Sequence, residues 1–167
     1  GMSWDKAPFR KLGEDLLRAG KVGAFTVAGG QGSRLGYEGP KGCYPAGAVS
    51  RKPLFEIFAD GIAAASRKYG KPVPWYIMTS PLNHQQTVDF FTERTYFGLD
   101  PSTVMFFPQG VMPSLDLRSG KMLMTTKSEI ATNPDGHGGA LKALYQSGAV
   151  ADMKRRHVEH LSYFQVD

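Results

Sequence analysis

Cysteine is nearly absent from this sequence, since Cys43 is the single one among 167 residues. It can form no internal disulfide, and it has no partner for a Cys-x-x-Cys metal or redox motif. His84, His157 and His160 likewise have no ligand partners at the spacings typical of zinc sites. The pattern excludes a disulfide-rich domain. We interpret Cys43 as an ordinary small side chain and the three histidines as surface or packing residues.

Long apolar runs are also missing. No run approaches the roughly 20 residues that a membrane-spanning helix needs, and residues 1–10 lack the apolar core of a secretory signal. We therefore expect a cytoplasmic protein with no membrane partner. Gly1 precedes Met2 and is interpreted as the remnant of a removed tag, outside the fold.

Charge of one sign is in modest excess. Twenty Lys and Arg against fifteen Asp and Glu give a net charge of +5, which suits nucleic acid or a polyanionic small ligand. The basic residues are scattered apart from a run at 154–156, and no basic-aromatic motif repeats as it does in RNA-binding sheets. We expect no nucleic acid partner, and we expect the run at 154–156 to form a solvated helix face.

The chain alternates between segments of helical periodicity and short apolar runs, over a length that suits one domain. Helices are expected at 9–19, at 53–70, after Asn83 as N-cap and from 134 onward, and strands at 22–28, 75–78, 104–107 and 161–166. This alternation predicts an α/β fold with a mostly parallel sheet flanked by helices. A turn at 118–120 predicts an inserted β-hairpin over 115–124. Ligands of such sheets bind at the carboxyl ends of the strands.

A glycine-rich loop follows the first predicted strand. Residues 28–36 read AGGQGSRLG, and Pro40 and Lys41 follow shortly after. Consecutive glycines let the backbone approach a ligand and direct several N–H groups at phosphate oxygens. The guanidinium of Arg34 can donate to two phosphate oxygens at once, and Lys41 adds a compact positive charge. The loop therefore favours a polyphosphate ligand over its other interpretation, a tight structural turn.

Two other phosphate-binding loops do not fit the spacing. A dinucleotide fingerprint starting at Gly30 and Gly32 requires glycine at position 35, where Leu35 stands. A Walker A loop requires glycine, lysine and then serine or threonine, whereas Lys41 precedes Gly42 here. The ligand is therefore expected to be neither a dinucleotide nor the nucleotide of a P-loop enzyme.

The segment at 28–36 resembles the signature of the UDP-sugar pyrophosphorylase family, Gly-Gly-x-Gly-Thr-Arg-Leu-Gly followed by Pro-Lys. The resemblance continues in the family's order and approximate spacing through IMTS at 77–80, FFPQG at 106–110, PDGHGG at 134–139 and FQVD at 164–167. The branch that makes UDP-N-acetylglucosamine is the most similar, because Pro134, Asp135, Gly136 and Gly139 resemble its pattern. Such a family resemblance implies a Rossmann-like fold of the nucleotide-diphospho-sugar transferase type.

Two residues depart from that pattern. Ser33 stands where threonine is usual, and it keeps the hydroxyl group. His137 stands where the acetylglucosamine branch commonly has asparagine, and it resembles the UDP-glucose branch. The resemblance therefore implies a uridylyltransferase that converts UTP and a sugar 1-phosphate into a UDP-sugar and pyrophosphate. N-acetylglucosamine 1-phosphate is the expected sugar substrate, and a UDP-glucose or broad UDP-sugar specificity stays open.

The resemblance also implies which residues hold the nucleotide. Main-chain or side-chain contacts to UTP are expected from Ala28, Gly29, Gly30, Gly32, Ser33, Gln109 and Gly136. Gln109 carries both an amide donor and an acceptor, so it can pair with the edge of uracil. Gly136 is implied to offer a backbone group to the same base.

The remaining roles concern charge and the sugar. Arg34 and Lys41 are implied as the catalytic residues, because they can neutralise the charge of the reacting phosphates. His137 is implied to lie near the sugar, where a neutral imidazole can donate to a hydroxyl. Asp167 is implied to hold the cofactor Mg²⁺, which prefers carboxylate and phosphate oxygens. Asp135 is expected either to take part in the site or only to shape its loop.

Family members are much longer than this chain. Residues 1–21 are expected to supply a leading helix and the tag remnant, and residues 22–167 the nucleotide-binding part of the catalytic domain, truncated at its C-terminal side. The sheet would then keep an open edge through which the chain could self-associate. Two alternatives from other classes stay open. One is a UTP-binding module without turnover, and the weaker one is a nucleic-acid-binding domain that uses the net positive charge.

Overall fold

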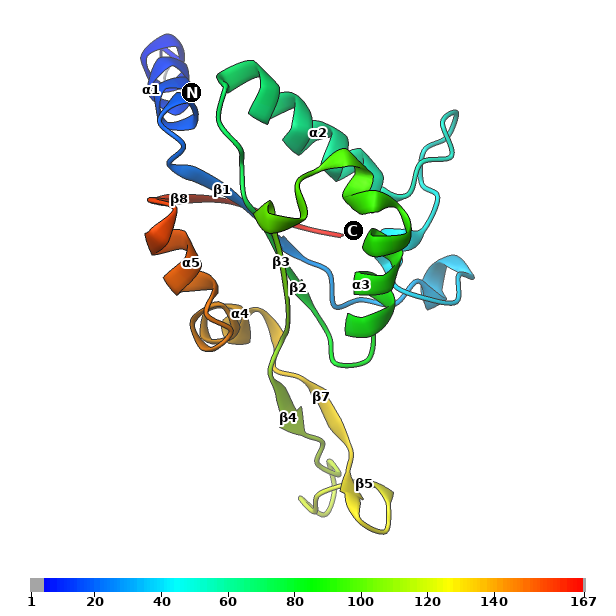
Figure 1. Cartoon of the computed structure of the whole chain (residues 1–167). Helices are drawn as coiled ribbons and strands as arrows, with labels where there is room; N and C mark the ends of the chain where they lie inside the picture. The colour runs from blue at the N-terminus through cyan, green and yellow to red at the C-terminus, as the bar shows by residue number, and fades with distance from the viewer. Residues whose placement is uncertain (1–4, 167) are drawn as a thin grey trace.

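The computed structural model describes residues 5–166, apart from the side chain of His137 (Figure 1). The main elements are α1 (Ala7–Arg18), β1 (Val22–Val27), α2 (Leu54–Tyr69), β2 (Trp75–Thr79), α3 (His84–Glu93), β3 (Val104–Pro108), α4 (Gly136–Gln146), α5 (Ala149–Arg155) and β8 (His160–Gln165). Each predicted helix and strand is found, with ends shifted by a few residues. None of the helices in the described part of the chain is long and apolar enough to cross a membrane.

The four long strands form one parallel sheet in the order β3-β2-β1-β8. The predicted parallel sheet is therefore confirmed. Val27, at the end of β1, lies opposite Met78 of β2 and Gln165 of β8, and Met78 lies opposite Phe107 of β3. The carboxyl ends of all four strands consequently meet at one edge of the sheet.

Helices cover both faces of this sheet, with α2 and α3 on one side and α4 and α5 on the other (Figure 1). Successive strand residues alternate between these two layers. Trp75 and Ile77 pack with Phe55 of α2 and Phe91 of α3, whereas Tyr76 joins the layer of α4 and α5. Because apolar residues occupy both sides of each central strand, the strands read as continuous apolar runs in the sequence.

An arm of short strands projects from the carboxyl edge of the sheet (Figure 1). It contains the antiparallel pairs β4 (Val111–Pro113) with β7 (Thr132–Pro134) and β5 (Met124–Thr126) with β6 (Glu129–Ile130). The hairpin predicted over 115–124 is present: Leu115 lies opposite Met122, the Asp116 N–H donates to the Lys121 carbonyl at 2.8 Å, and the Leu123 N–H donates to the Ser114 carbonyl at 2.9 Å. Its turn is held by Asp116, which accepts hydrogen bonds from the N–H and hydroxyl of Ser119, both at 2.7 Å. The pairing of the arm extends beyond residues 115–124, because β4 pairs with β7 and β5 pairs with β6.

The basic run at 154–156 is only partly the solvated helix face that the sequence predicts. Arg155 is exposed, but Arg156 is one-third exposed and fixed at both ends of its guanidinium. Its Nε donates to Asp152 Oδ2 at 2.7 Å, and its terminal nitrogen donates to the carbonyl of Ser102 at 2.6 Å. The prediction is wrong for Arg156, because its side chain is held by a partner far away in the sequence, the carbonyl of Ser102 in the turn before β3.

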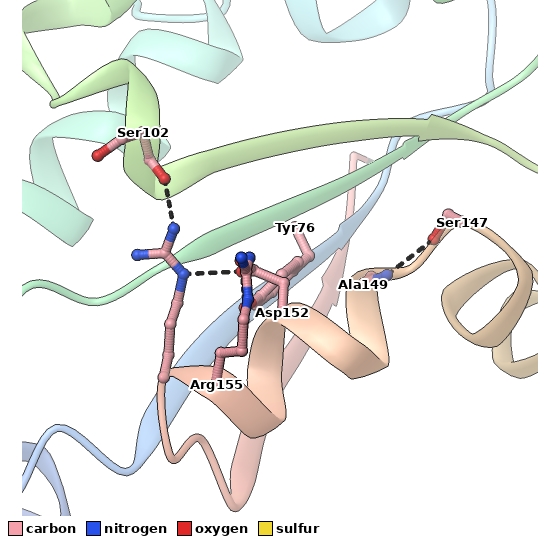
Figure 2. Close-up of polar contacts among 7 residues, drawn as sticks. Tyr76, Ser102, Ser147, Ala149, Asp152 and Arg155 are labelled. Carbon is pink, nitrogen blue, oxygen red and sulfur yellow. Dashed lines mark hydrogen bonds and ion pairs between the residues drawn. The ribbon is translucent and has the colours of Figure 1, made fainter.

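Asp152 is the centre of this polar cluster, which Figure 2 shows. Its carboxylate pairs with Arg155 and Arg156 and accepts a hydrogen bond from the Tyr76 hydroxyl at 2.8 Å. Burial opposes ionisation of Asp152, but the hydrogen bonds from Arg156, Tyr76 and Arg155 outweigh it and lower the pKa of this carboxyl group. Burial and the neighbouring carboxylate raise the pKa of Tyr76, so its hydroxyl stays a donor. The cluster ties α5 to the beginning of β3.

We predict that Asp152→Asn lowers the free energy of unfolding at pH 7 by about 1–3 kcal/mol, because Arg155 and Arg156 lose their anionic partner in a mostly buried place. The folded pKa of Asp152 is lowered, so its stabilisation is complete above the ordinary aspartate pKa of about 4 and is lost as the pH falls through the folded value. Urea unfolding of both proteins as a function of pH checks this. A difference that widens below about pH 4 would contradict the assignment.

Candidate functional site

A cavity of about 420 Å³ lies at the carboxyl edge of the sheet. Its walls are the glycine-rich loop after β1, the residue after β3, the beginning of α4 and the end of β8. It therefore lies at the edge where the sequence predicts the ligand. Seven of the predicted site residues, from separate segments, line the cavity: Gly29, Gly30, Ser33, Arg34, Lys41, Gln109 and Gly136.

Two other predicted residues, Ala28 and Gly32, are not among the cavity walls that the structure describes. Ala28 is buried beneath the loop, where its N–H donates to the carbonyl of Met78 at 2.7 Å. Gly32 packs against Tyr37, and a Cβ at position 32 would lie 2.9 Å from that ring. Ala28 and Gly32 therefore shape the loop from behind. The side chain of His137, at the beginning of α4, and the whole of Asp167 lie outside the described residues.

The glycine-rich loop folds back on itself before α2. The Lys41 N–H donates to the Gly30 carbonyl at 3.0 Å, and the Gly32 N–H donates to the Gly39 carbonyl at 2.9 Å. Gln31 and Pro40 lie opposite each other between these two bonds. This short antiparallel pairing explains how Lys41 reaches the same cavity as Arg34, although residues 35–40 separate them in the sequence.

Gln109 lies deepest among the polar side chains of the cavity, at 9% exposed. Its N–H donates to the carbonyl of Thr79 at 2.7 Å, which fixes the residue to the end of β2. A Cβ at position 29 would lie 3.1 Å from the Gln109 amide nitrogen. Glycine at position 29 therefore allows this amide to lie directly against the loop backbone.

Asp135 supports the far wall of the cavity, and the sequence leaves its role open. Its N–H donates to the Gly110 carbonyl at 3.1 Å. Its carboxylate lies so close to Gly110 and Gly139 that a Cβ would come within 2.2 Å of it at position 110 and within 2.0 Å at position 139. Oδ1 is buried, and it has no hydrogen-bond partner in the part of the chain that the structure describes. Asp135 thus joins the segment of Gln109 to the beginning of α4.

Several cavity residues are missed by the sequence reasoning, namely Val27, Gln31, Met78, Pro134, Gln165 and Val166. Gln31 could have been found, because it stands between the glycines of the loop. Gln165 and Val166 precede Asp167 in the FQVD segment and end β8, so their place in the motif was also a signal. The sequence indicates core positions for Met78 and Val27. They line the cavity because they lie near the carboxyl ends of β2 and β1.

The described residues that line the cavity carry a net positive charge. Arg34 and Lys41 line the cavity, and none of its described lining residues is acidic. Arg34 is exposed and Lys41 is half-buried. No group of three or more His, Cys, Asp or Glu that could hold a metal is found within residues 5–166. Two cations and a run of glycine backbone suit a polyphosphate better than a bare metal ion.

Comparison with protein families gives one match over nearly the whole chain. The family described as UTP–glucose-1-phosphate uridylyltransferase matches residues 10–167. Among curated proteins, UDP-N-acetylglucosamine diphosphorylase 2 of Arabidopsis thaliana is 38% identical, over 98% of this chain and 34% of the plant protein. The chain therefore spans about a third of the length of this relative.

Solved structures agree with this comparison. The crystal structure of UDP-N-acetylglucosamine pyrophosphorylase from Trypanosoma brucei, in complex with an inhibitor, matches with a TM-score of 0.84 at 27% identity, over 97% of this chain and 36% of that one. A mutant of UDP-glucose pyrophosphorylase from Leishmania major matches with a TM-score of 0.74 at 17% identity, over 92% of this chain and 31% of that one. The second likeness shows the shared fold alone.

We predict that Gly139→Ala destabilises the protein by about 1–3 kcal/mol, because its Cβ would overlap the Asp135 carboxylate and force apart the segments that carry Gln109 and Gly136. Gly138→Ala is the matched control, since a Cβ there meets nothing within 4 Å. We expect it to change the free energy of unfolding by at most about 1 kcal/mol. Urea unfolding of the two variants checks this, and equal losses would rule out the contact with Asp135 as the cause.

Proposed function

Because the chain belongs to the UTP–glucose-1-phosphate uridylyltransferase family, we propose that it carries the UTP-binding part of an enzyme that makes UDP-sugars and pyrophosphate. The observation that carries this proposal is the cavity itself, where a glycine-rich backbone, two cations and a buried glutamine amide converge from separate segments. Each of these groups suits a different part of UTP. A nucleic-acid-binding domain would require neither the buried amide nor the glycine backbone beside it.

Gln109 is proposed to select the base. Its amide can donate to one carbonyl of uracil and accept from the ring N–H, a pattern that cytosine cannot match at the same atoms. The side chain is buried and lies against Gly29, so the amide has little freedom to turn. Gly136 lies on the cavity wall and is proposed to offer a main-chain group to the same base.

The phosphates are proposed to lie along the loop. An oxygen of the sugar 1-phosphate attacks the α-phosphorus of UTP, the bond from that phosphorus to the oxygen of the β-phosphate breaks, and pyrophosphate leaves. The nucleophile is already an anion, so no protein base is needed, and alignment and charge neutralisation provide the catalysis. Arg34 and Lys41 are the described residues that supply positive charge to the cavity.

Magnesium is proposed to bind at this cavity through Asp167. Val166 lines the cavity and Asp167 follows it in the sequence, and a carboxylate together with phosphate oxygens is the donor set that Mg²⁺ prefers. When bound, the ion would neutralise phosphate charge next to Arg34 and Lys41. Because the described lining residues include no carboxylate, we propose Asp167 as the residue that holds the ion.

We propose N-acetylglucosamine 1-phosphate as the second substrate. The plant relative and the trypanosome protein are both named for UDP-N-acetylglucosamine, which supports this choice. His137 supports the alternative, a UDP-glucose or broad UDP-sugar pyrophosphorylase. Since the chain spans about a third of its relatives, a UTP-binding module without turnover is the remaining candidate. Turnover of the chain with each sugar 1-phosphate distinguishes these three.

We predict that the chain binds UTP in preference to CTP in the presence of Mg²⁺, and that Gln109→Ala abolishes the preference because the uracil edge loses its partner. Calorimetric titration measures both affinities. Gln86→Ala is the control, since Gln86 is exposed on α3 and is not part of the cavity wall. Equal affinity for the two nucleotides in the unmodified chain would exclude Gln109 as the base-reading residue.

We predict that Arg34→Ala and Lys41→Ala each weaken UTP binding about tenfold or more and depress turnover at least as strongly, because a charged hydrogen bond to phosphate is worth about 1.5–3 kcal/mol. Their melting temperatures should stay close to that of the unmodified protein. Lys142→Ala removes the same charge from the exposed face of α4 and serves as the control. If melting temperature and affinity fell together, the two side chains would be structural.

A further inference from the structure

Asn83 is a polar side chain that is completely buried beneath the glycine-rich loop. It precedes α3, where the sequence predicts an N-cap, but its side chain makes no capping hydrogen bond to the helix. Its Oδ1 accepts from the Ser80 N–H at 2.8 Å. Its Nδ2 donates to the carbonyls of Ala28 at 3.1 Å and Gly30 at 3.4 Å. The amide therefore connects the turn after β2 to the loop after β1.

These two bonds determine where the loop N–H groups point. In a planar trans peptide the carbonyl and the next N–H point in opposite directions. Holding the Ala28 carbonyl toward Asn83 therefore turns the Gly29 N–H away from Asn83, and holding the Gly30 carbonyl does the same for the Gln31 N–H. Gly29 and Gln31 line the cavity, whereas Asn83 does not.

The N–H groups of Gly29 and Gln31 are available to a ligand. No residue within the described range accepts a hydrogen bond from either of them. The Gly30 carbonyl is also held by the Lys41 N–H at 3.0 Å, so the peptide before Gln31 is fixed by two donors. Glycine backbone is otherwise free to adopt many conformations, and fixing it in advance lowers the entropy lost when an anion binds.

We propose that Asn83 is a positioning residue that directs the N–H groups of Gly29 and Gln31 at the phosphates of the bound nucleotide. This inference rests on the proposed function, because it concerns the same cavity. Asn83 touches the loop carbonyls and not the ligand, so its removal loosens the phosphate contacts and leaves the uracil contact of Gln109 in place. The effect should therefore depend on the phosphate groups of the ligand.

The test compares UTP with uridine, which has the base but no phosphate. In Asn83→Ala we expect UTP affinity to fall about tenfold, with uridine affinity changed less than twofold. Thr87→Ala is the matched control. Thr87 is also completely buried, and its hydroxyl donates to the Asn83 carbonyl at 2.8 Å, so its loss weakens the same turn without freeing the loop carbonyls. We expect Thr87→Ala to keep the ratio of the two affinities.

Equal loss of UTP and uridine affinity in Asn83→Ala, or an unchanged UTP affinity, overturns the positioning role alone. Absence of UTP binding by the unmodified chain overturns the proposed function together with this inference. Should Asn83→Ala fail to fold, amide NMR of the unmodified chain decides the matter with inorganic tripolyphosphate as the probe. Shifts concentrated at the Gly29 and Gln31 amides support the proposal, and shifts confined to other segments overturn it.

Discussion

Hydrogen bonding in register between β1 and its neighbours is the constraint on which the site depends. Val27 lies opposite Met78 on one side and Gln165 on the other, so the loops that leave these strands begin at the same level of the sheet. A shift of one residue would turn every side chain to the opposite layer. The two apolar layers, with Trp75 on one face and Tyr76 on the other, prevent such a shift. The core thereby fixes the level at which the loops of the site begin.

Local patterns in the sequence were enough to predict the layers and the edge that carries the cavity. Apolar runs that end in glycine are typical of buried parallel strands, and the glycines at 29 and 30 do lie on the cavity wall. The same pattern cannot show which side of a loop faces a ligand. Gly32 looks equivalent to Gly29 in the sequence, but Tyr37 occupies the space beside it. That difference arises from tertiary packing.

Partners distant in the sequence explain the other differences. Asn83 is a residue type typical of an N-cap, but its amide instead donates to the loop carbonyl of Ala28, 55 residues away. Arg156 belongs to a basic run that predicts a solvated side chain, but its guanidinium donates to the carbonyl of Ser102, 54 residues away. A buried carbonyl without a donor is costly, and a side chain that can reach it is drawn away from its local role. No window of neighbouring residues contains that information.

The close packing of Asp135 between Gly110 and Gly139 has a consequence for how this sequence can change over time. A side chain at either glycine needs the space that the carboxylate fills, so each substitution requires Asp135 to move out of that space or to be replaced by a smaller residue. The three positions are therefore coupled, although residues 111–134 separate the first from the other two. Relatives that carry a side chain at either glycine should therefore also differ at position 135, and libraries that vary one position at a time will miss the permitted combinations.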